Sequence, residues 1–189
     1  MKILCEVSVR HIHLSEADLK TLFGKDAKLE VVRKISQPGQ FLSDKRVDLV
    51  GPKRTIENVS VLGPIRPDTQ VEVSRTDCFT LGLKDVPVRL SGDVKGTPGI
   101  IIRAGDKTLD LKSGVIVSQR HVHIDQATAQ KNGFVNGQVV SVKVESDRGG
   151  TLEGVIVRTG PSHANAIHLD SDEGNALAAC ACGMAEIIK

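Results

Sequence analysis

The chain has 189 residues, a formal net charge of +2 and 40% hydrophobic residues, with neither Trp nor Tyr. This length suits one large domain or two small ones. With four Phe as its only aromatic residues, the core must be built from Val, Ile and Leu, and abundant Val and Ile favour β-strands. The small net charge and the scarcity of aromatic residues that could stack on bases argue against a nucleic-acid-binding protein. No apolar run approaches the roughly 18 residues of a membrane span.

The first element in chain order is a strand with two histidines near its end. Residues 7–14 read Val-Ser-Val-Arg-His-Ile-His-Leu, and apolar residues alternate there with Arg10, His11 and His13. Residues i and i+2 of a strand project from the same face, so both imidazoles point toward one place. Imidazole is the commonest metal ligand among side chains, and the pair indicates part of a metal site. A single His-x-His pair is, however, more often ordinary surface or core.

A short helix and a series of short strands follow. Ser15 is suited to cap a helix over residues 16–23, and Gly24 to end it in the left-handed conformation. Short strands at close spacing are typical of small barrels or sandwiches. Those predicted here, separated by Gly and Pro turns, are 59–62, 70–74, 86–90, 100–103 and 115–118.

Two charged residues of this central region are candidate site residues. Glu72 lies between two valines in the strand at 70–74, and alternation by itself predicts a solvent-facing carboxylate there. Arg66 lies in the rigid turn Gly-Pro-Ile-Arg-Pro, and arginine is suited to two-point contact with a phosphate or a carboxylate. The residues alone leave open whether each side chain serves a site or is simply solvated.

The strand with two histidines recurs 110 residues later. Residues 7–18 and 117–128 are identical at six of twelve positions, and His121 and His123 repeat the first pair. A cap, a short helix and a glycine again follow, at Asp125, residues 126–132 and Gly133. All six histidines fall in the two pairs or in one further cluster. The repeat therefore predicts a duplicated metal site in a pseudo-symmetric pair of domains.

The third histidine cluster contains His163 and His168. A His-x-His pair leaves a metal undercoordinated, because a catalytic zinc typically takes three protein ligands and keeps one position open. His168 precedes an acidic stretch that can hold its ring, whereas His163 follows a Gly-Pro-Ser turn. His168 is the better candidate, but periodicity does not decide between them. The first half contains no third histidine, so a carboxylate must serve there.

The last part of the chain contains a predicted hairpin and a predicted helix. Residues 139–145 and 152–158 alternate on either side of a Gly-Gly turn, which indicates a hairpin. The Ala-rich stretch at 175–187 favours a helix, although Gly183 weakens that prediction.

The cysteines indicate a compartment rather than a site. They contain no C-x-x-C pair, which argues against a cysteine-based zinc site or redox motif; they are Cys5, Cys78, Cys180 and Cys182. The start of the chain is too short for a signal peptide. A reducing cytoplasm, with the thiols free, is the simplest location.

Five segments together carry a family resemblance. They read RHIHLSEADLKTLFG, ISQPGQF, VGPKRTIENVSVLGPIRPDTQVEVSRTDCFTLG, GVIVSQRHVHI and HLDSDEGNA. In order and spacing they resemble the PduL-type phosphate propanoyltransferases, the phosphotransacylases of propanediol-utilising microcompartments. The matching segments are spread from Val7 to about Ala176, nearly the whole chain.

The resemblance implies a mainly β fold of two small β-barrel domains with short helices and a dimetal site between them. The domains are expected at 10–117 and 118–189, with residues 1–9 joining the second. The implied reaction moves a propanoyl or acetyl group between coenzyme A and phosphate, with two zinc ions per chain, or cobalt in their place. Carried over by motif, the ligands are His11, His13 and Glu72 for one metal and His121, His123 and His168 for the other. Arg66 matches the phosphate-binding arginine of the catalytic site.

The resemblance also implies contacts to coenzyme A from Val7, Ser8, Val9, Lys53, Phe79 and Asn175. Val9 and Ser60 differ from the Asn and Arg frequent in the family, which bears on the coenzyme A pocket and acyl preference and not on the metal ligands. Only six residues precede the Val-Ser strand, so the N-terminal extension that directs many members into microcompartments is not seen. A microcompartment lumen, shell or enzyme partners and a homo-oligomer stay open. Rival functions are a dinuclear zinc hydrolase acting on a thioester or phosphate ester, and a barrel module with structural zinc.

Overall fold

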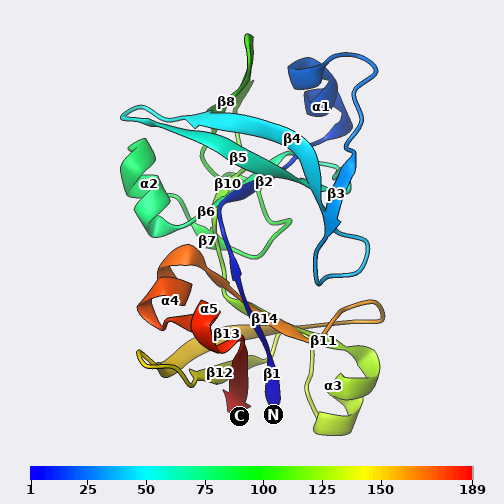
Figure 1. Ribbon diagram of the computed structural model, residues 1–189, viewed down its shortest axis with the longest axis vertical. Coiled ribbons are helices and arrows are strands. Elements are labelled where there is room, and N and C mark those ends of the chain that lie inside the picture. Colours follow the sequence, from blue (N-terminus) through cyan, green and yellow to red (C-terminus); the bar gives the residue numbers. More distant parts are fainter. Residues whose placement is uncertain (189) are drawn as a thin grey trace. The chain divides into compact units, whose positions relative to one another are not determined.

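The computed structural model describes residues 1–188, without the side chains of residues 181 and 182. The fold is mainly β, as predicted, and divides into two compact units (Figure 1). The barrel unit comprises Met1–Val9, Ser36–Pro38 and Gln119–Lys189. The open-sheet unit comprises Arg10–Ile35 and Gly39–Ser118. Neither unit is a continuous stretch of sequence.

The barrel unit is a closed barrel with strand order β1-β14-β11-β13-β12-β15. Alternate residues of its strands, such as Val122 and Ile124, are fully buried in one apolar core with Val155 and Val157. The strands are β1 (Lys2–Ser8), β11 (His121–Asp125), β12 (Val139–Val144), β13 (Gly150–Gly160), β14 (Ala166–Asp170) and β15 (Met184–Ile188). The hairpin predicted at 139–158 is therefore present as β12 and β13.

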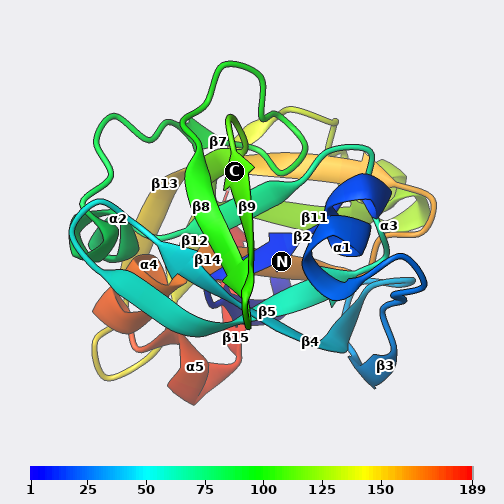
Figure 2. The same ribbon diagram turned by 90° about the horizontal axis from the view of Figure 1, so that it is seen from above.

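The open-sheet unit does not close into a barrel. Its nine strands form one sheet of order β7-β10-β6-β2-β5-β4-β8-β9, with β3 paired to β4. Figure 2 shows β8 and β9 side by side, and this antiparallel pair forms one end of the sheet. The strands are β2 (His11–His13), β3 (Val31–Lys34), β4 (Phe41–Val50), β5 (Thr55–Gly63), β6 (Gln70–Val73), β7 (Val88–Arg89), β8 (Ile100–Ala104), β9 (Lys107–Leu111) and β10 (Val115–Ser118).

Both predicted helices after the histidine strands are present, as α1 (Glu16–Phe23) and α3 (Gln126–Asn132). Their caps act as expected, because the side chains of Ser15 and Asp125 accept hydrogen bonds from backbone N–H groups of the first turn. Gly133 ends α3 in the left-handed conformation. Gly24 has φ +103° and ψ 163°, so the left-handed cap predicted there was wrong. None of the helices formed by residues 1–188 is long and apolar enough to cross a membrane.

A further helix, α2 (Arg75–Leu81), follows β6 and was not predicted from the sequence. Ser74 caps it through a reciprocal pair of hydrogen bonds with Asp77.

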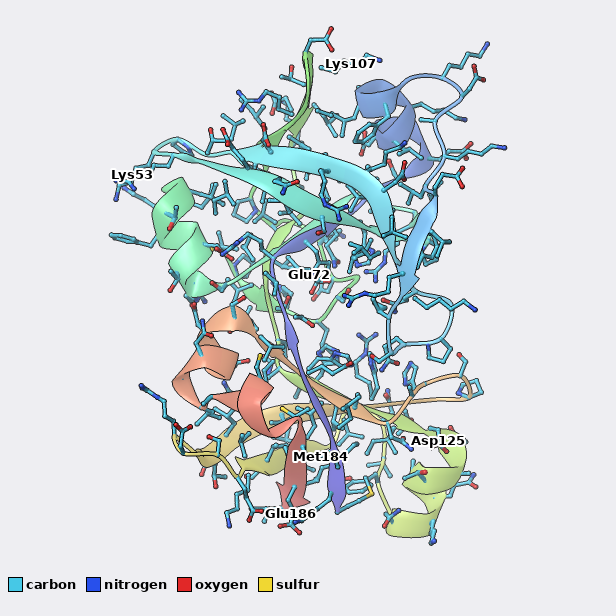
Figure 3. All side chains as sticks on the ribbon, in the orientation of Figure 1. Lys53, Glu72, Lys107, Asp125, Met184 and Glu186 are labelled. Carbon is cyan, nitrogen blue, oxygen red and sulfur yellow. The ribbon has the colours of Figure 1, made fainter. Side chains whose placement is uncertain are left out.

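The helix predicted at 175–187 is confirmed only in part, because its last residues form a strand. The chain forms α4 (Ser171–Ala176) and α5 (Ala179–Cys182), and Gly183 then adopts φ +63° and ends the helical segment. Residues from Met184 onward form β15, which pairs with both β1 and β12 and so closes the barrel; Figure 3 labels Met184 and Glu186 on this strand. Closure of the barrel satisfies two strand edges, which outweighs the helix propensity of the alanines.

The strand that precedes each histidine pair in the sequence does not belong to the same unit as that pair. β1 precedes the first pair in sequence but pairs in parallel with β14 of the barrel unit. β10 precedes the second pair but pairs in parallel with β6 of the open-sheet unit. Each unit is thus completed by a strand from the opposite copy of the repeat.

Candidate metal centres

The two histidine strands pair with their neighbours in the same register. In the open-sheet unit β2 runs antiparallel to β6, and His11 lies opposite Glu72. In the barrel unit β11 runs antiparallel to β14, and His121 lies opposite His168. Directly opposite residues of an antiparallel pair project from the same face. Strand register therefore brings a third side chain to each histidine pair.

These side chains form two groups that could hold a metal ion. Within each group, one candidate ligand atom from each residue lies within 4.8 Å of the others. The members are His11, His13 and Glu72 in the open-sheet unit, and His121, His123 and His168 in the barrel unit. The geometry thus assembles the same six residues that the motifs select.

The open-sheet group is almost fully enclosed by the protein. Nε2 of His11 lies 3.5 Å and Nε2 of His13 lies 4.0 Å from Oε1 of Glu72, which projects from β6 (Figure 3). Burial, followed by the charges of His11 and Arg66, lowers the pKa of His13 to about 3, so this imidazole is neutral at pH 7. Burial alone would raise the pKa of Glu72, but the neighbouring His11 and a hydrogen bond from Ser118 help to hold it well below its usual value. A neutral imidazole and an ionised carboxylate are the forms that bind metals.

The barrel group is built from three imidazoles. The rings of His121 and His123 are 4.7 Å apart and those of His123 and His168 are 5.1 Å apart, centre to centre. Nδ1 of His121 lies 2.8 Å from the carbonyl oxygen of Gln119, so this ring presents Nε2 to the group. Burial and the neighbouring His121 and His168 lower the pKa of His123 to about 2. A ring that stays neutral at pH 7 keeps a lone pair for a metal.

Two ring nitrogens carry the strongest indication that metals fit. Within residues 1–188, Nδ1 of His13 and Nδ1 of His123 are buried and have no hydrogen-bond partner. They occupy the same position in the two copies of the repeat. An unpaired buried polar atom is costly, so its recurrence at equivalent positions is explained if each nitrogen faces a ligand.

His163 lies beside the barrel group but outside the set of three. Its ring is 4.3 Å from that of His123, centre to centre, and its Nδ1 lies 3.1 Å from the carbonyl oxygen of Arg158. Gly160 makes room for it, because a Cβ there would lie 2.9 Å from the ring. His163 therefore packs against a candidate ligand.

Polar side chains surround the carboxylate of Glu72. Gln70 and Ser91 donate hydrogen bonds of 2.6 and 2.8 Å to Oε1, and Ser118 donates one of 2.5 Å to Oε2. Nη1 of Arg66 donates to Oγ of Ser91 at 2.7 Å. Arg66 is therefore one side chain removed from a candidate metal ligand. Its backbone N–H also donates to the carbonyl oxygen of Leu14, at 3.0 Å, which ties the turn to the end of the histidine strand.

The barrel group has its own supporting residues. Gln37 is 5% exposed, and its Nε2 lies 3.2 Å from Nε2 of His168 and donates to the carbonyl oxygen of Ala164 at 3.1 Å. An oxygen of Glu6 lies 3.8 Å from Nδ1 of His168 and accepts a hydrogen bond from Ser36. Two loop residues and one strand residue thus hold the third histidine.

The residues expected to contact coenzyme A divide between the two units. In the open-sheet unit, Nζ of Lys53 lies 4.2 Å from the ring centre of Phe79, which is 73% exposed on α2; Figure 3 labels Lys53 at the β4–β5 turn. In the barrel unit, Val9 is 57% exposed and Asn175 is exposed on α4. Val7 and Ser8 end β1 and are half-buried.

Five side chains that contact Glu72 or His168 were not identified from the sequence. Some had a signal: Gln70 is two residues from Glu72 on one strand, and Ser118 repeats Ser8. Gln37 stands in one of the matching segments, ISQPGQF. Glu6 and Ser91 had none, because only the folded chain brings them to the ligands.

Comparisons with known proteins show which family the chain is similar to. The family model described as phosphate propanoyltransferase matches residues 4–180. A phosphate propanoyltransferase of Alkaliphilus metalliredigens is 47% identical over 94% of this chain and 84% of its own length. Those of Thermotoga maritima and Listeria monocytogenes are 47% and 44% identical, over 92% and 90% of this chain and 83% and 80% of their own lengths.

Similarity of this extent to proteins named phosphate propanoyltransferase defines an acyltransferase enzyme. The chain belongs to the phosphate propanoyltransferase family.

Proposed function

We propose that this protein is a phosphotransacylase that moves a short acyl group between coenzyme A and inorganic phosphate. Propanoyl is the main acyl group that we propose, and acetyl is the alternative. The family supports this reaction. The observation that carries the proposal furthest is the pair of three-residue groups in matching register, one of which is joined to Arg66 through Ser91. Acyl transfer to phosphate brings several negative charges together, and these residues offer positive charge and metal ligands to balance them.

Each group would hold one divalent metal, which we assign as zinc, with cobalt as the alternative. Both metals accept nitrogen and oxygen ligands, and three protein ligands are typical of a catalytic zinc. When bound, the metals supply Lewis acidity and neutralise negative charge. His11, His13 and Glu72 would hold one ion, and His121, His123 and His168 the other.

Arg66 is the proposed phosphate-binding residue. Its guanidinium group can donate two parallel hydrogen bonds to phosphate oxygens, and Ser91 holds its Nη1 from one side. An oxygen of phosphate then attacks the thioester carbonyl. The new C–O bond forms, the C–S bond breaks, and the phosphate proton passes to the departing thiolate. Phosphate is itself the nucleophile, so no acyl-enzyme forms and no cysteine takes part.

Coenzyme A would be bound outside the metal groups. Lys53 over the exposed ring of Phe79 offers a positive charge and an aromatic face, as a nucleotide with phosphates requires. The end of β1 (Val7, Ser8 and Val9) and Asn175 are the other proposed contacts. The preference between propanoyl and acetyl groups is worth only about 1–3 kcal/mol, since one methylene separates them.

We place the reaction in the cytoplasm, with a microcompartment lumen as the alternative location. A homo-oligomer and shell or enzyme partners are separate proposals that the family also allows. These are tested by measuring native mass and by fractionating the cells that make the protein. A microcompartment enzyme would sediment with the shells.

The deciding experiment follows release of coenzyme A thiol from propanoyl-CoA with and without phosphate. A phosphotransacylase releases thiol only when phosphate or arsenate is present. The rival, a zinc hydrolase, has a specific observation in its favour, because a site with three ligands leaves a position for water. Thiol release of equal rate without phosphate would establish the hydrolase. Repeating the assay with acetyl-CoA measures the acyl preference.

A further inference from the structure

We propose that Ser118 is a positioning residue for the metal ligand Glu72. Its hydroxyl holds Oε2 of the carboxylate and leaves Oε1 as the oxygen nearest to His11 and His13. This inference rests on the proposed function, because it gives Glu72 a metal to bind. It adds a residue that neither the histidine motif nor the alternation of β6 assigns to the site.

The two oxygens of Glu72 have different partners. Oε1 is the oxygen that lies 3.5 Å from Nε2 of His11 and 4.0 Å from Nε2 of His13. Oε2 accepts the hydroxyl proton of Ser118 at 2.5 Å. A hydrogen bond of this length to an ionised acceptor is charge-assisted and among the stronger ones. Gln70 and Ser91 donate to Oε1, so Ser118 is the donor on the other oxygen and, together with them, fixes the rotation of the carboxylate about its last bond.

The position of Ser118 in the fold supports a role at this site. β10 pairs in parallel with β6, with Ile116 opposite Glu72. Val115, Ile116 and Val117 are fully or almost fully buried in the open-sheet unit, and Ser118 is the first polar residue of the strand. Its hydroxyl meets the carboxylate where the apolar part of β10 ends.

The repeat shows that the serine acquires this role from its surroundings. Ser8 is the identical residue in the first copy, but on β1 it lies opposite Asp170 in the register of β14. The third ligand of that unit is His168, which can offer only one nitrogen to a metal. A carboxylate can offer one oxygen or two, so only Glu72 needs a partner that selects between them.

Holding a ligand in one orientation lowers the cost of binding the metal. Residues that hydrogen-bond to metal ligands typically contribute about 10- to 100-fold to metal affinity. We therefore expect removal of the Ser118 hydroxyl to weaken zinc binding at the open-sheet group by about that factor and to leave the barrel group unchanged.

The test compares Ser118→Thr with Ser118→Val in the full chain. Thr and Val have the same shape and both suit a strand, but only Thr keeps a hydroxyl. Each is combined with His123→Ala, which disables the barrel group, and separately with His13→Ala, which disables the open-sheet group. Zinc affinity is measured by competition with a chromophoric chelator. The absorption spectrum of bound cobalt gives a second readout of the ligands.

The expected result is specific to one group. With His123→Ala, the Val variant binds zinc about 10- to 100-fold more weakly than the Thr variant, and their cobalt spectra differ. With His13→Ala, the two variants bind zinc equally. Ser113→Ala is the matched control, because it removes a half-buried hydroxyl of the same unit that donates to the carbonyl oxygen of Val94. It should leave zinc affinity unchanged.

Two failures are distinguishable. If the protein with His123→Ala binds zinc and the Thr and Val variants have equal affinity, Ser118 is not a positioning residue and the proposed function stands. If the unsubstituted protein binds no zinc or cobalt, the metal sites of the proposed function fail together with this inference.

Discussion

The two metal groups share a histidine pair and a strand register but differ in their third member. In the open-sheet unit it is Glu72, a carboxylate held by three hydrogen-bond donors. In the barrel unit it is His168, which lies opposite His121 just as Glu72 lies opposite His11. The two copies of the repeat therefore keep the positions of three candidate ligands and differ in the charge of one.

That change makes the two proposed sites unequal. A divalent metal bound by three neutral imidazoles keeps one more unit of positive charge than one bound by two imidazoles and a carboxylate. The barrel group should thus stabilise a negative ligand more strongly, and the open-sheet group should retain its metal more strongly. The open-sheet unit also contains Arg66, whose charge contributes to the lowered pKa of His13. The arginine replaces part of the positive charge that Glu72 cancels.

Removing a histidine of either pair should have the largest effect. We expect His13→Ala and His123→Ala each to lower bound zinc from about two ions per chain to about one. Turnover should fall by more than the 10²- to 10³-fold that loss of one oxyanion-stabilising group costs. Thermal stability should also fall, because metal binding contributes to folding. Elemental analysis, thiol release and thermal unfolding measure these effects. Full activity with either histidine replaced would show that the two groups do not act together.

The next prediction sharpens the identity of the third ligand in the barrel unit. His168→Ala should remove one zinc and most of the activity, since it removes a member of the three-residue group. His163→Ala should leave more activity and both metals, because that ring packs against His123 and points its Nδ1 at the carbonyl oxygen of Arg158. Metal content and thiol release are measured for both variants. The reverse order would make His163 the ligand and end the matching register between the units.

Arg66 tests the asymmetry between the units. Arg66→Ala should raise the KM for phosphate and lower kcat/KM by about 10- to 150-fold, which corresponds to the loss of one charge-assisted hydrogen bond of roughly 1.5–3 kcal/mol. Metal content should not change, and the KM for acyl-CoA should change less. Arg66→Lys should restore only part of the lost kcat/KM, since lysine keeps the charge but lacks the planar guanidinium group.

The matched control for this prediction is Arg103→Ala. Arg103 lies in the same unit and pairs with Asp48 away from the ligands, so its loss should leave the phosphate KM unchanged. If Arg66→Ala changes the KM for phosphate and the KM for acyl-CoA equally, or changes neither, Arg66 is a structural residue of its turn.

The smallest effect concerns the helices that follow the two histidine strands. Ser15→Ala removes the cap of α1 and should lower the free energy of unfolding by about 1 kcal/mol. Asp125→Ala removes the corresponding cap of α3 and should also lower the free energy of unfolding. Denaturant unfolding measures both, and zinc content should stay at about two per chain. Loss of zinc in either variant would mean that the caps position the histidines as well as the helices.

The sequence alone was enough to predict most of the local elements and two of the three members of each group. Alternation and duplication predicted the two histidine strands, their caps and the short helices, because these depend on neighbours within a few residues. The same local pattern predicted that Glu72 faces solvent on its strand, and only the family resemblance made it a candidate ligand. It also extended a helix through residues that form β15, since the alanines of the tail favour a helix when considered alone.

Tertiary structure decided everything that depends on which strands pair. The register of β6 against β2 and of β14 against β11 brings a third candidate ligand to each histidine pair. The exchange of β1 and β10 between the copies brings Ser118 to Glu72 and Glu6 to His168. Barrel closure converts the tail into a strand. A sequence pattern shows which face a residue occupies but not which strand will lie beside it, because pairing is set by burial and hydrogen bonding across the whole sheet.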